Sequence, residues 1–210
     1  MPTEKFYNLK EGKKQAILEA AGDELLETPY SLLTVSRIIQ KAGISRASFY
    51  YYFSDKEDLF RHLREEMKNH FIKVVEKALR QKQGNFREGF QAVISTMLED
   101  GGFRKNCCLY QRMVEDTECH NQAVRQEAAF HEKEGLREFV KNCQGLLNPE
   151  LYPGLDEEKT VCLMELGVLV VAKTLFLYLI GSEKKEYLEG IAGVQLEILD
   201  RGARALPRKS

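Results

Sequence analysis

The 210-residue sequence has little of the residue types that mark several protein classes. Five prolines are too few for a proline-rich linker protein, and 43% hydrophobic residues are too many for a disordered chain. Five cysteines, an odd number without regular spacing, predict a reducing, cytoplasmic setting rather than a disulfide framework. The opening residues lack the apolar stretch of a secretion signal. We therefore expect an ordinary globular chain in the cytoplasm.

The sequence also lacks an excess of positive or negative charge, because its formal net charge is -1. This balance excludes a uniformly basic nucleic-acid coat, but it does not exclude a local basic face. Between residues 31 and 56 the charged side chains are Arg37, Lys41, Arg46, Asp55 and Lys56, which give +3. The preceding segment is acidic, with Glu11, Glu19, Asp23, Glu24 and Glu27. A nucleic acid would therefore have to meet the basic segment.

No segment shows the alternation of a strand, whereas apolar residues recur three and four apart almost throughout. The sequence predicts an all-α fold. Capping and breaking residues divide it into nine expected helices, near residues 10–27, 34–42, 45–51, 55–81, 86–100, 104–118, 122–146, 156–181 and 184–205.

The segment Val161–Ile180 is close to the length of a membrane span, with only Glu165, Lys173 and Thr174 polar. Two charges near the middle of a bilayer would each cost about 2.5 to 3.5 kcal/mol. A helix buried on nearly every side has the same pattern. We expect such a helix and no membrane partner.

Residues 34–49 have the pattern of a helix-turn-helix. Small Ala42 allows two helices to cross closely, Gly43 permits the positive φ of a tight turn, and Ile44 fills the angle between the helices. Ser45 is the expected N-cap of a short second helix, and Phe49 and Phe53 are expected to point into a three-helix core. The other side of the second helix is left to contact DNA.

In such a unit the second helix enters the major groove. Arg46 could then bind guanine through two hydrogen bonds, and Ala47 could contact a thymine methyl. Thr34, Tyr52 and Lys56 are placed to bind phosphates, and Arg37 could reach phosphate or base. The predicted DNA-binding residues are Thr34, Arg37, Ser45, Arg46, Ala47, Tyr50, Tyr51, Tyr52 and Lys56.

These residues resemble the TetR family of bacterial transcription regulators. The resemblance rests on Ala42-Gly43-Ile44-Ser45, the run from Phe49 to Leu59 with its three tyrosines and Lys56, and the preceding Ile17–Ala21 segment. It implies a helix-turn-helix DNA-binding domain at residues 1–54 and an effector-binding and dimerisation domain of six helices at residues 55–210. It also implies a homodimer that binds a palindromic operator as a repressor and is released by a small molecule.

The dimer seam is expected on the last two helices. The apolar helix Val161–Ile180 and the stripe Tyr187, Leu188, Ile191, Val194 and Ile198 could pair with their copies as a four-helix bundle. An intramolecular core is the alternative explanation of the same pattern.

The middle helices are expected to line an effector chamber, as the resemblance implies. The candidate lining residues are Phe90, Ile94, Met97, Tyr110, Met113, Phe130 and Tyr178, although core packing is the favoured interpretation of each one. No polar cluster among them identifies an effector.

Cys107 and Cys108 precede a leucine at an expected helix start, where the helix dipole could lower a thiol pKa. A redox or electrophile sensor is one interpretation, and inert packing is the other. Cysteine and histidine lack zinc-site spacing, so we expect no metal. No cofactor is expected.

Common catalytic motifs are absent, so we expect no enzyme. A thiol-dependent enzyme using Cys108 and His131 is the remaining catalytic alternative, and a helical interaction module without DNA contact is a third hypothesis.

Overall fold

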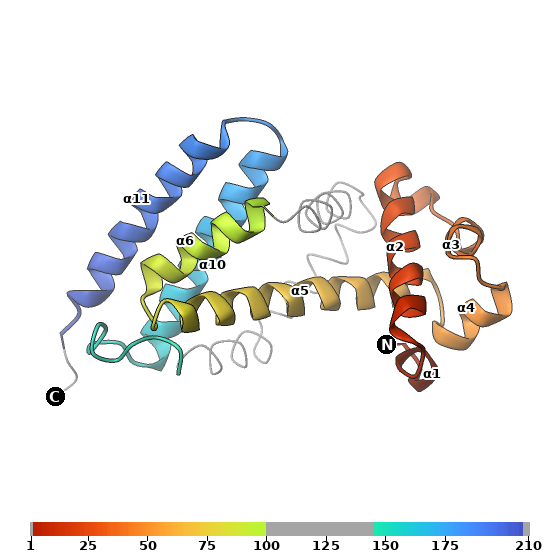
Figure 1. Ribbon diagram of the computed structural model, residues 1–210, viewed down its shortest axis with the longest axis horizontal. Coiled ribbons are helices and arrows are strands. Elements are labelled where there is room, and N and C mark those ends of the chain that lie inside the picture. The colour runs from red at the N-terminus through yellow and green to blue at the C-terminus, as the bar shows by residue number, and fades with distance from the viewer. Residues whose placement is uncertain (1, 100–144, 208–210) are drawn as a thin grey trace. The chain divides into compact units, whose positions relative to one another are not determined.

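The computed structural model describes residues 2–99 and 145–207, and within these ranges all regular structure is helical (Figure 1). The helices are α1 (Glu4–Tyr7), α2 (Glu11–Glu27), the 3-10 helix η1 (Tyr30–Leu32), α3 (Val35–Ala42), α4 (Arg46–Tyr52), α5 (Lys56–Gln81), α6 (Phe86–Glu99), α10 (Glu157–Leu179) and α11 (Lys185–Arg204). The predicted all-α class is confirmed.

The seven expected helices that fall in the described ranges agree with the observed ones to within two residues at each end. The two helices expected near 104–118 and 122–146 lie outside the described residues, apart from the last two positions. The short elements α1 and η1 were not predicted. Each is a single turn, too short to show a helical repeat of apolar residues.

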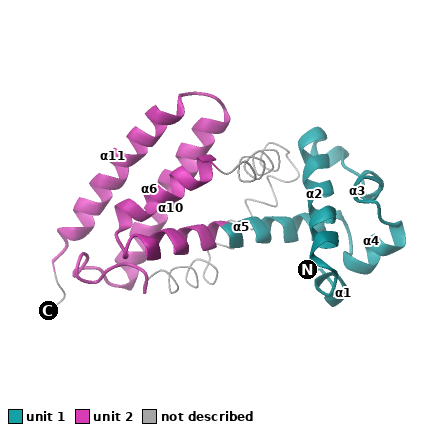
Figure 2. Ribbon diagram, in the orientation of Figure 1, with its two compact units in different colours: residues 1–70, 108–126 teal, residues 71–107, 127–210 magenta. Residues whose placement is uncertain are grey.

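The described residues form two compact units, which meet in sequence between His70 and Phe71 (Figure 2). Helix α5 contributes to both units, because its first four turns supply Leu59, Phe60, Leu63 and Met67 to the core of the first unit. The expected domains, 1–54 and 55–210, stay a prediction. The division between the two units falls inside α5, where packing changes. The helix continues without a break there, so the sequence gives no sign of this division.

The first unit is built on an aromatic core. Its largest fully buried side chains include Phe6, Phe49, Phe53 and Phe60, which come from α1, from α4 and its C-cap, and from α5. The rings of Phe49 and Phe53 lie 5.6 Å apart, and those of Phe6 and Phe53 lie 4.8 Å apart. Both predicted inward positions, Phe49 and Phe53, are confirmed.

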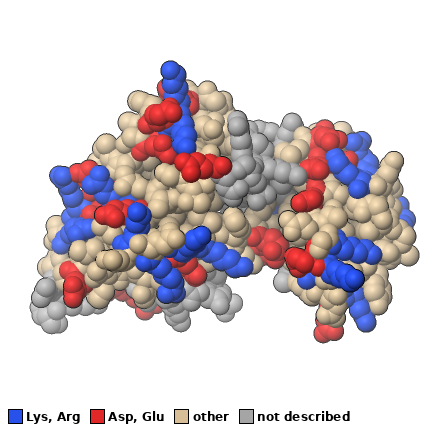
Figure 3. Space-filling model, viewed as in Figure 1, with Lys and Arg blue, Asp and Glu red and all other residues tan. Residues whose placement is uncertain are grey.

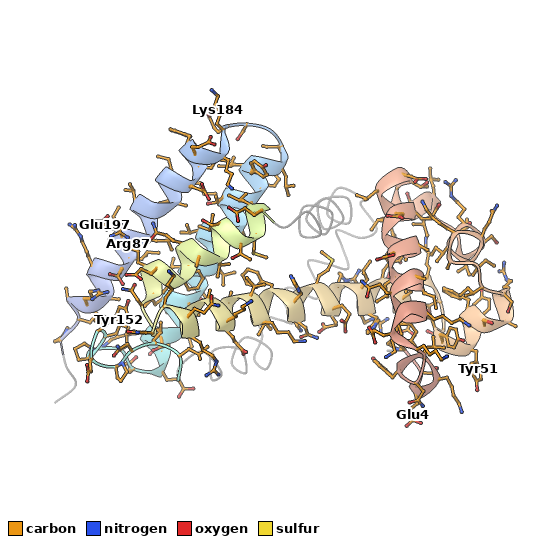
Figure 4. The ribbon with its side chains drawn as sticks, in the orientation of Figure 1. Glu4, Tyr51, Arg87, Tyr152, Lys184 and Glu197 are labelled. Carbon is orange, nitrogen blue, oxygen red and sulfur yellow. The ribbon has the colours of Figure 1, made fainter. Side chains whose placement is uncertain are left out.

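The second unit packs the end of α5 with α6, α10 and α11. Helices α6 and α10 approach closely at Gly167, where a Cβ atom would lie 2.7 Å from the Phe90 ring. Arg87 of α6 and Glu197 of α11 form an ion pair at 3.3 Å on the surface of this unit (Figure 4). The contact between Gly167 and the Phe90 ring thus sets how closely α6 and α10 approach.

A buried polar cluster joins three segments of the second unit. The Tyr152 hydroxyl accepts a hydrogen bond from the backbone N–H of Phe86 at 2.8 Å and donates one to the carboxylate of Asp200. Arg204 completes the cluster, since its Nε donates to Asp200 at 2.7 Å. Burial, followed by the bond to Asp200, raises the pKa of Tyr152 above its ordinary value of 10.0. The phenol therefore stays protonated and remains a donor.

Helices α10 and α11 each expose a row of large apolar side chains, which we call the apolar face. Its members are Leu166, Leu169, Phe176 and Ile180 on α10, and Tyr187, Ile191, Val194 and Ile198 on α11. Within each helix they recur at three, four or seven residues and so share one side. By length and composition alone α10 could also cross a membrane, a property it shares with core helices of globular proteins.

Candidate nucleic-acid interface

The turn between α3 and α4 has the geometry that its sequence predicts. Gly43 has φ 63° and ψ 34°, a left-handed conformation that favours glycine. Ser45 then caps α4, because its side-chain oxygen accepts the backbone N–H of Ser48 at 3.0 Å. Gly43 thus ends α3 and Ser45 starts α4, so these two residues form the turn between the helices.

Arg46, in the first turn of α4, is exposed and held by two neighbours. Its Nη1 donates to the hydroxyl of Ser36 on α3 at 3.2 Å, and its Nη2 donates to the hydroxyl of Tyr50 at 3.3 Å. The guanidinium also lies 5.6 Å from the centre of the Tyr50 ring. These contacts restrict the rotamers of a long side chain before any ligand arrives, which lowers the entropic cost of binding. Sequence reasoning did not identify Ser36 as a partner.

The three successive tyrosines of α4 have different environments. Tyr50 and Tyr51 are 47% and 55% exposed, whereas Tyr52 is only 7% exposed and packs against Phe6 in the core. The structure therefore corrects the expected surface position of Tyr52. Successive residues of a helix point in different directions, so a run of three identical residues must divide between core and solvent. Figure 4 shows Tyr51 pointing outward from α4.

Part of the predicted basic face is neutralised within the first unit. Arg37 donates to the carboxylate of Glu24 on α2 at 2.6 Å, and Lys41 lies 2.9 Å from Glu27 and 3.5 Å from Glu24. The hydrogen bond from Arg37, opposed by burial, lowers the pKa of Glu24. The acidic end of α2 thus binds two of the four cations counted from sequence. Charges of both signs are interspersed on the visible surface of this unit (Figure 3).

Lys56 starts α5 and contacts the loop before α3. Its Nζ donates to the backbone carbonyls of Tyr30 at 2.9 Å and Leu33 at 3.3 Å, and it lies 4.3 Å from the Tyr30 ring centre. Lys56 therefore positions the entry to α3, where exposed Thr34 is the N-cap and uses no side-chain capping bond. The sequence indicated a cation here but not this use of its donors.

The helix-turn-helix coincides with a known family of domains. A sequence model described as "Bacterial regulatory proteins, tetR family" matches residues 17–63, from α2 to the early turns of α5. Residues 17–63 therefore match the TetR family in sequence. The match covers the turn, the tyrosine run and Lys56.

Proteins similar to this chain include named regulators. A fatty acid metabolism regulator protein of Bacillus subtilis is 33% identical over 86 residues, which span 41% of this chain and 44% of that protein. The chain is thus matched to less than half the length of this curated relative. A regulator structure from Syntrophomonas wolfei has TM-score 0.66 at 18% identity, covering 91% of this chain and 96% of that one. The fatty acid degradation regulator FadR of Bacillus halodurans has TM-score 0.60 at 18% identity, covering 94% and 99%.

The effector residues that the TetR resemblance implied are distributed unevenly. Phe90, Ile94 and Met97 of α6 are almost fully buried in the core of the second unit, and Tyr178 of α10 is half-buried. Tyr110, Met113 and Phe130 lie outside the described residues, as do Cys107 and Cys108. The chamber and the reactive thiols stay predictions. Within residues 2–99 and 145–207, no group of histidine, cysteine or acidic side chains could hold a metal ion.

Proposed function

We propose that this protein is a ligand-responsive transcription regulator of the TetR family that binds DNA and catalyses no reaction. The observation that carries the proposal is the family match over residues 17–63, on a helix-turn-helix whose second helix exposes Arg46, Ala47, Tyr50 and Tyr51. An exposed recognition helix is what reading of the major groove requires. In a bacterium this activity belongs to the cytoplasm, where the DNA lies.

The exposed residues divide into two roles. Arg46, pre-oriented by Ser36 and Tyr50, would read a base edge, with Ala47 beside it. Thr34, Ser45, Tyr50 and Tyr51 would contact phosphate or base from the helix ends and the exposed side of α4. Arg37 and Lys56 would act mainly as positioning residues, because acidic or carbonyl oxygens of the protein already accept their hydrogen bonds.

The replacement Arg46→Ala tests base reading. Duplexes that the wild-type chain enriches from a random pool serve as specific DNA, and a scrambled duplex of equal length serves as non-specific DNA. We expect Arg46→Ala to cost about 1–3 kcal/mol on specific DNA and little on scrambled DNA. Arg80→Ala, which removes an exposed arginine from the second unit, is the matched control. Equal losses on both duplexes would count against base reading.

We further propose that the protein acts as a homodimer formed through the apolar face of α10 and α11. Eight large apolar side chains exposed on two adjacent helices are more than a monomer ordinarily leaves in water. A two-fold axis through this face would form a four-helix bundle, with two recognition helices available for a palindrome. The repressor role and the palindromic operator belong to the same proposal.

The replacement Leu169→Glu tests the seam. Leu169 is 63% exposed on α10, so a charge costs little in the monomer but would be buried in the bundle. We expect sedimentation velocity to show monomers at concentrations where the wild type is dimeric. Leu32→Glu is the control, because Leu32 of η1 is similarly exposed, at 68%, in the first unit. An unchanged dimer in Leu169→Glu would exclude this seam.

The proposed effector is a small apolar molecule that binds among the middle helices and changes the affinity for DNA. Two relatives are named for fatty acid metabolism or degradation, so fatty acids of graded chain length are the first probes. To shift the protein from 99:1 to 1:99 between its DNA-binding and non-binding conformations, an effector needs about 5.5 kcal/mol of differential affinity for the two. Release of bound duplex that depends on chain length would support this proposal. No effect at any length would exclude fatty acids as effectors.

A further inference from the structure

The residues ahead of α2 contact the recognition helix directly. Thr3 donates its backbone N–H to the carbonyl of Tyr52 at 2.9 Å and its hydroxyl to the carbonyl of Tyr51 at 2.8 Å. The last carbonyls of an α-helix have no donor within the helix, so a partner must come from elsewhere. Thr3 therefore closes the C-terminal end of α4 from a position 48 residues earlier in the chain.

Helix α1 fixes this contact in place. Phe6 is 1% exposed, and its ring lies 4.8 Å from that of Phe53 and 6.3 Å from that of Tyr52. On the other side it meets the ring of His62 of α5 edge-on at 5.1 Å. The segment is thus a packed part of the first unit and not a free tail.

Lys5 lies on the exposed side of this anchored turn. Its ammonium group lies 5.9 Å from the centre of the Tyr51 ring, within cation–π range. Tyr51 belongs to the exposed side of α4, so the positive charge is added at the border of the proposed DNA-binding face. Residues 2–14 contain four lysines and two glutamates, a net charge of +2, while the acidic end of α2 is occupied by Arg37 and Lys41.

We propose that Thr3–Tyr7 forms part of the DNA-binding surface, with Thr3 holding the end of the recognition helix and Lys5 contacting a backbone phosphate beside Tyr51. The inference rests on the proposed function and extends it to residues outside the segment matched by the family model, 17–63. A phosphate contact contributes affinity without sequence preference and makes binding more dependent on salt.

The test measures the affinity of Lys5→Ala for the enriched and scrambled duplexes over a range of salt concentrations. We expect similar fold losses on both duplexes. The slope of log K against log salt should become shallower by about 0.9 for each phosphate that the variant no longer binds, or about 1.8 for a dimer. Lys5→Arg should keep the wild-type slope. Lys184→Ala, which removes an exposed lysine at the start of α11, is the matched control.

The outcomes separate this inference from the proposed function. A slope for Lys5→Ala equal to that of the wild type and of Lys184→Ala overturns the phosphate contact while the regulator proposal stands. If the wild-type chain enriches no duplex, the proposed function fails first and the inference fails with it.

Thr3→Val and Thr3→Ser test the hold on the recognition helix, because valine keeps the shape of threonine and serine keeps its hydroxyl. Loss of one hydrogen bond corresponds to about a two- to tenfold change in an equilibrium constant. We expect a loss of this size for Thr3→Val on the enriched duplex, with wild-type affinity in Thr3→Ser. Equal affinities of the valine and serine variants would overturn this role.

Discussion

The two units of the molecule use apolar and polar residues in opposite ways. In the first unit large aromatic rings are buried, and the recognition helix presents Arg46, Tyr50 and Tyr51 to solvent. In the second unit a polar cluster around Tyr152 is buried, and α10 and α11 present leucine, isoleucine and phenylalanine instead. Both units are helical, so their difference lies in which side chains the helices expose.

This difference indicates two kinds of partner. A surface that offers hydrogen-bond donors and a cation suits a polyanion, whose phosphates and base edges accept hydrogen bonds. A surface of exposed apolar side chains suits a second protein surface, because removing it from water is favourable at roughly 25 cal/mol per Å². The comparison is therefore consistent with the two proposals above, DNA for the first unit and a second copy of the chain for the other.

The largest expected effect is on stability, and it comes from comparing two adjacent residues of α4, Phe49 and Tyr50. Phe49→Ala should destabilise the protein by about 3–5 kcal/mol, because Phe49 is fully buried in the aromatic core. Tyr50→Ala should change stability little and instead weaken binding to the enriched duplex, since Tyr50 is 47% exposed and contacts Arg46. Urea unfolding and duplex titration measure the two effects. Similar stability losses in both variants would contradict the division of α4 into two faces.

A smaller effect is expected in the second unit from Tyr152→Phe. The backbone N–H of Phe86 would lose its acceptor and Asp200 would lose a donor, at a cost of about 1–3 kcal/mol. Tyr51→Phe removes the same hydroxyl from an exposed ring of α4, outside the proposed dimer interface, and should leave the free energy of unfolding nearly unchanged. If urea unfolding gives equal stabilities for the two variants, the buried cluster contributes nothing specific to this unit.

The smallest effect is expected from Glu24→Gln in the first unit, because Arg37 is half exposed and solvent screens the pair. The pKa of Glu24 is lowered from 4.5, chiefly by the hydrogen bond from Arg37. The pair therefore contributes stability above pH 4.5 and loses it as the pH falls through the lower, folded-state pKa. Thermal unfolding of wild type and Glu24→Gln should differ at neutral pH and converge in acid. Glu19→Gln, an exposed change on the same helix, is the control.

Local patterns were sufficient for much of the first unit. Gly43 and Ser45 act over one or two residues, so the conformation of the turn and its cap could be predicted before any tertiary contact was known. The tyrosine run could not be resolved in the same way. Tyr52 differs from Tyr51 only in what packs against it, and Phe6 comes from a turn 46 residues earlier that periodicity could not detect.

The charges show the same limit. Counting Arg37, Lys41, Arg46 and Lys56 predicts a basic face, but the sequence does not say which cations are already paired. Glu24 and Glu27, which lie on another helix, bind Arg37 and Lys41, while Lys56 donates to the loop before α3. Arg46 remains at the exposed start of α4, held by Ser36 and Tyr50.

The sequence by itself determined the helical class, the turn at Gly43, the cap at Ser45 and the resemblance of the first segment to the TetR family, because each depends on residues close together in the chain. Only the tertiary structure decided that Tyr52 is buried, that Arg37 is paired, that Thr3 closes α4 and that one side of α10 and α11 stays uncovered. These features depend on groups distant in sequence that approach within a few ångströms. Their distances are set by how whole helices pack and not by any local pattern.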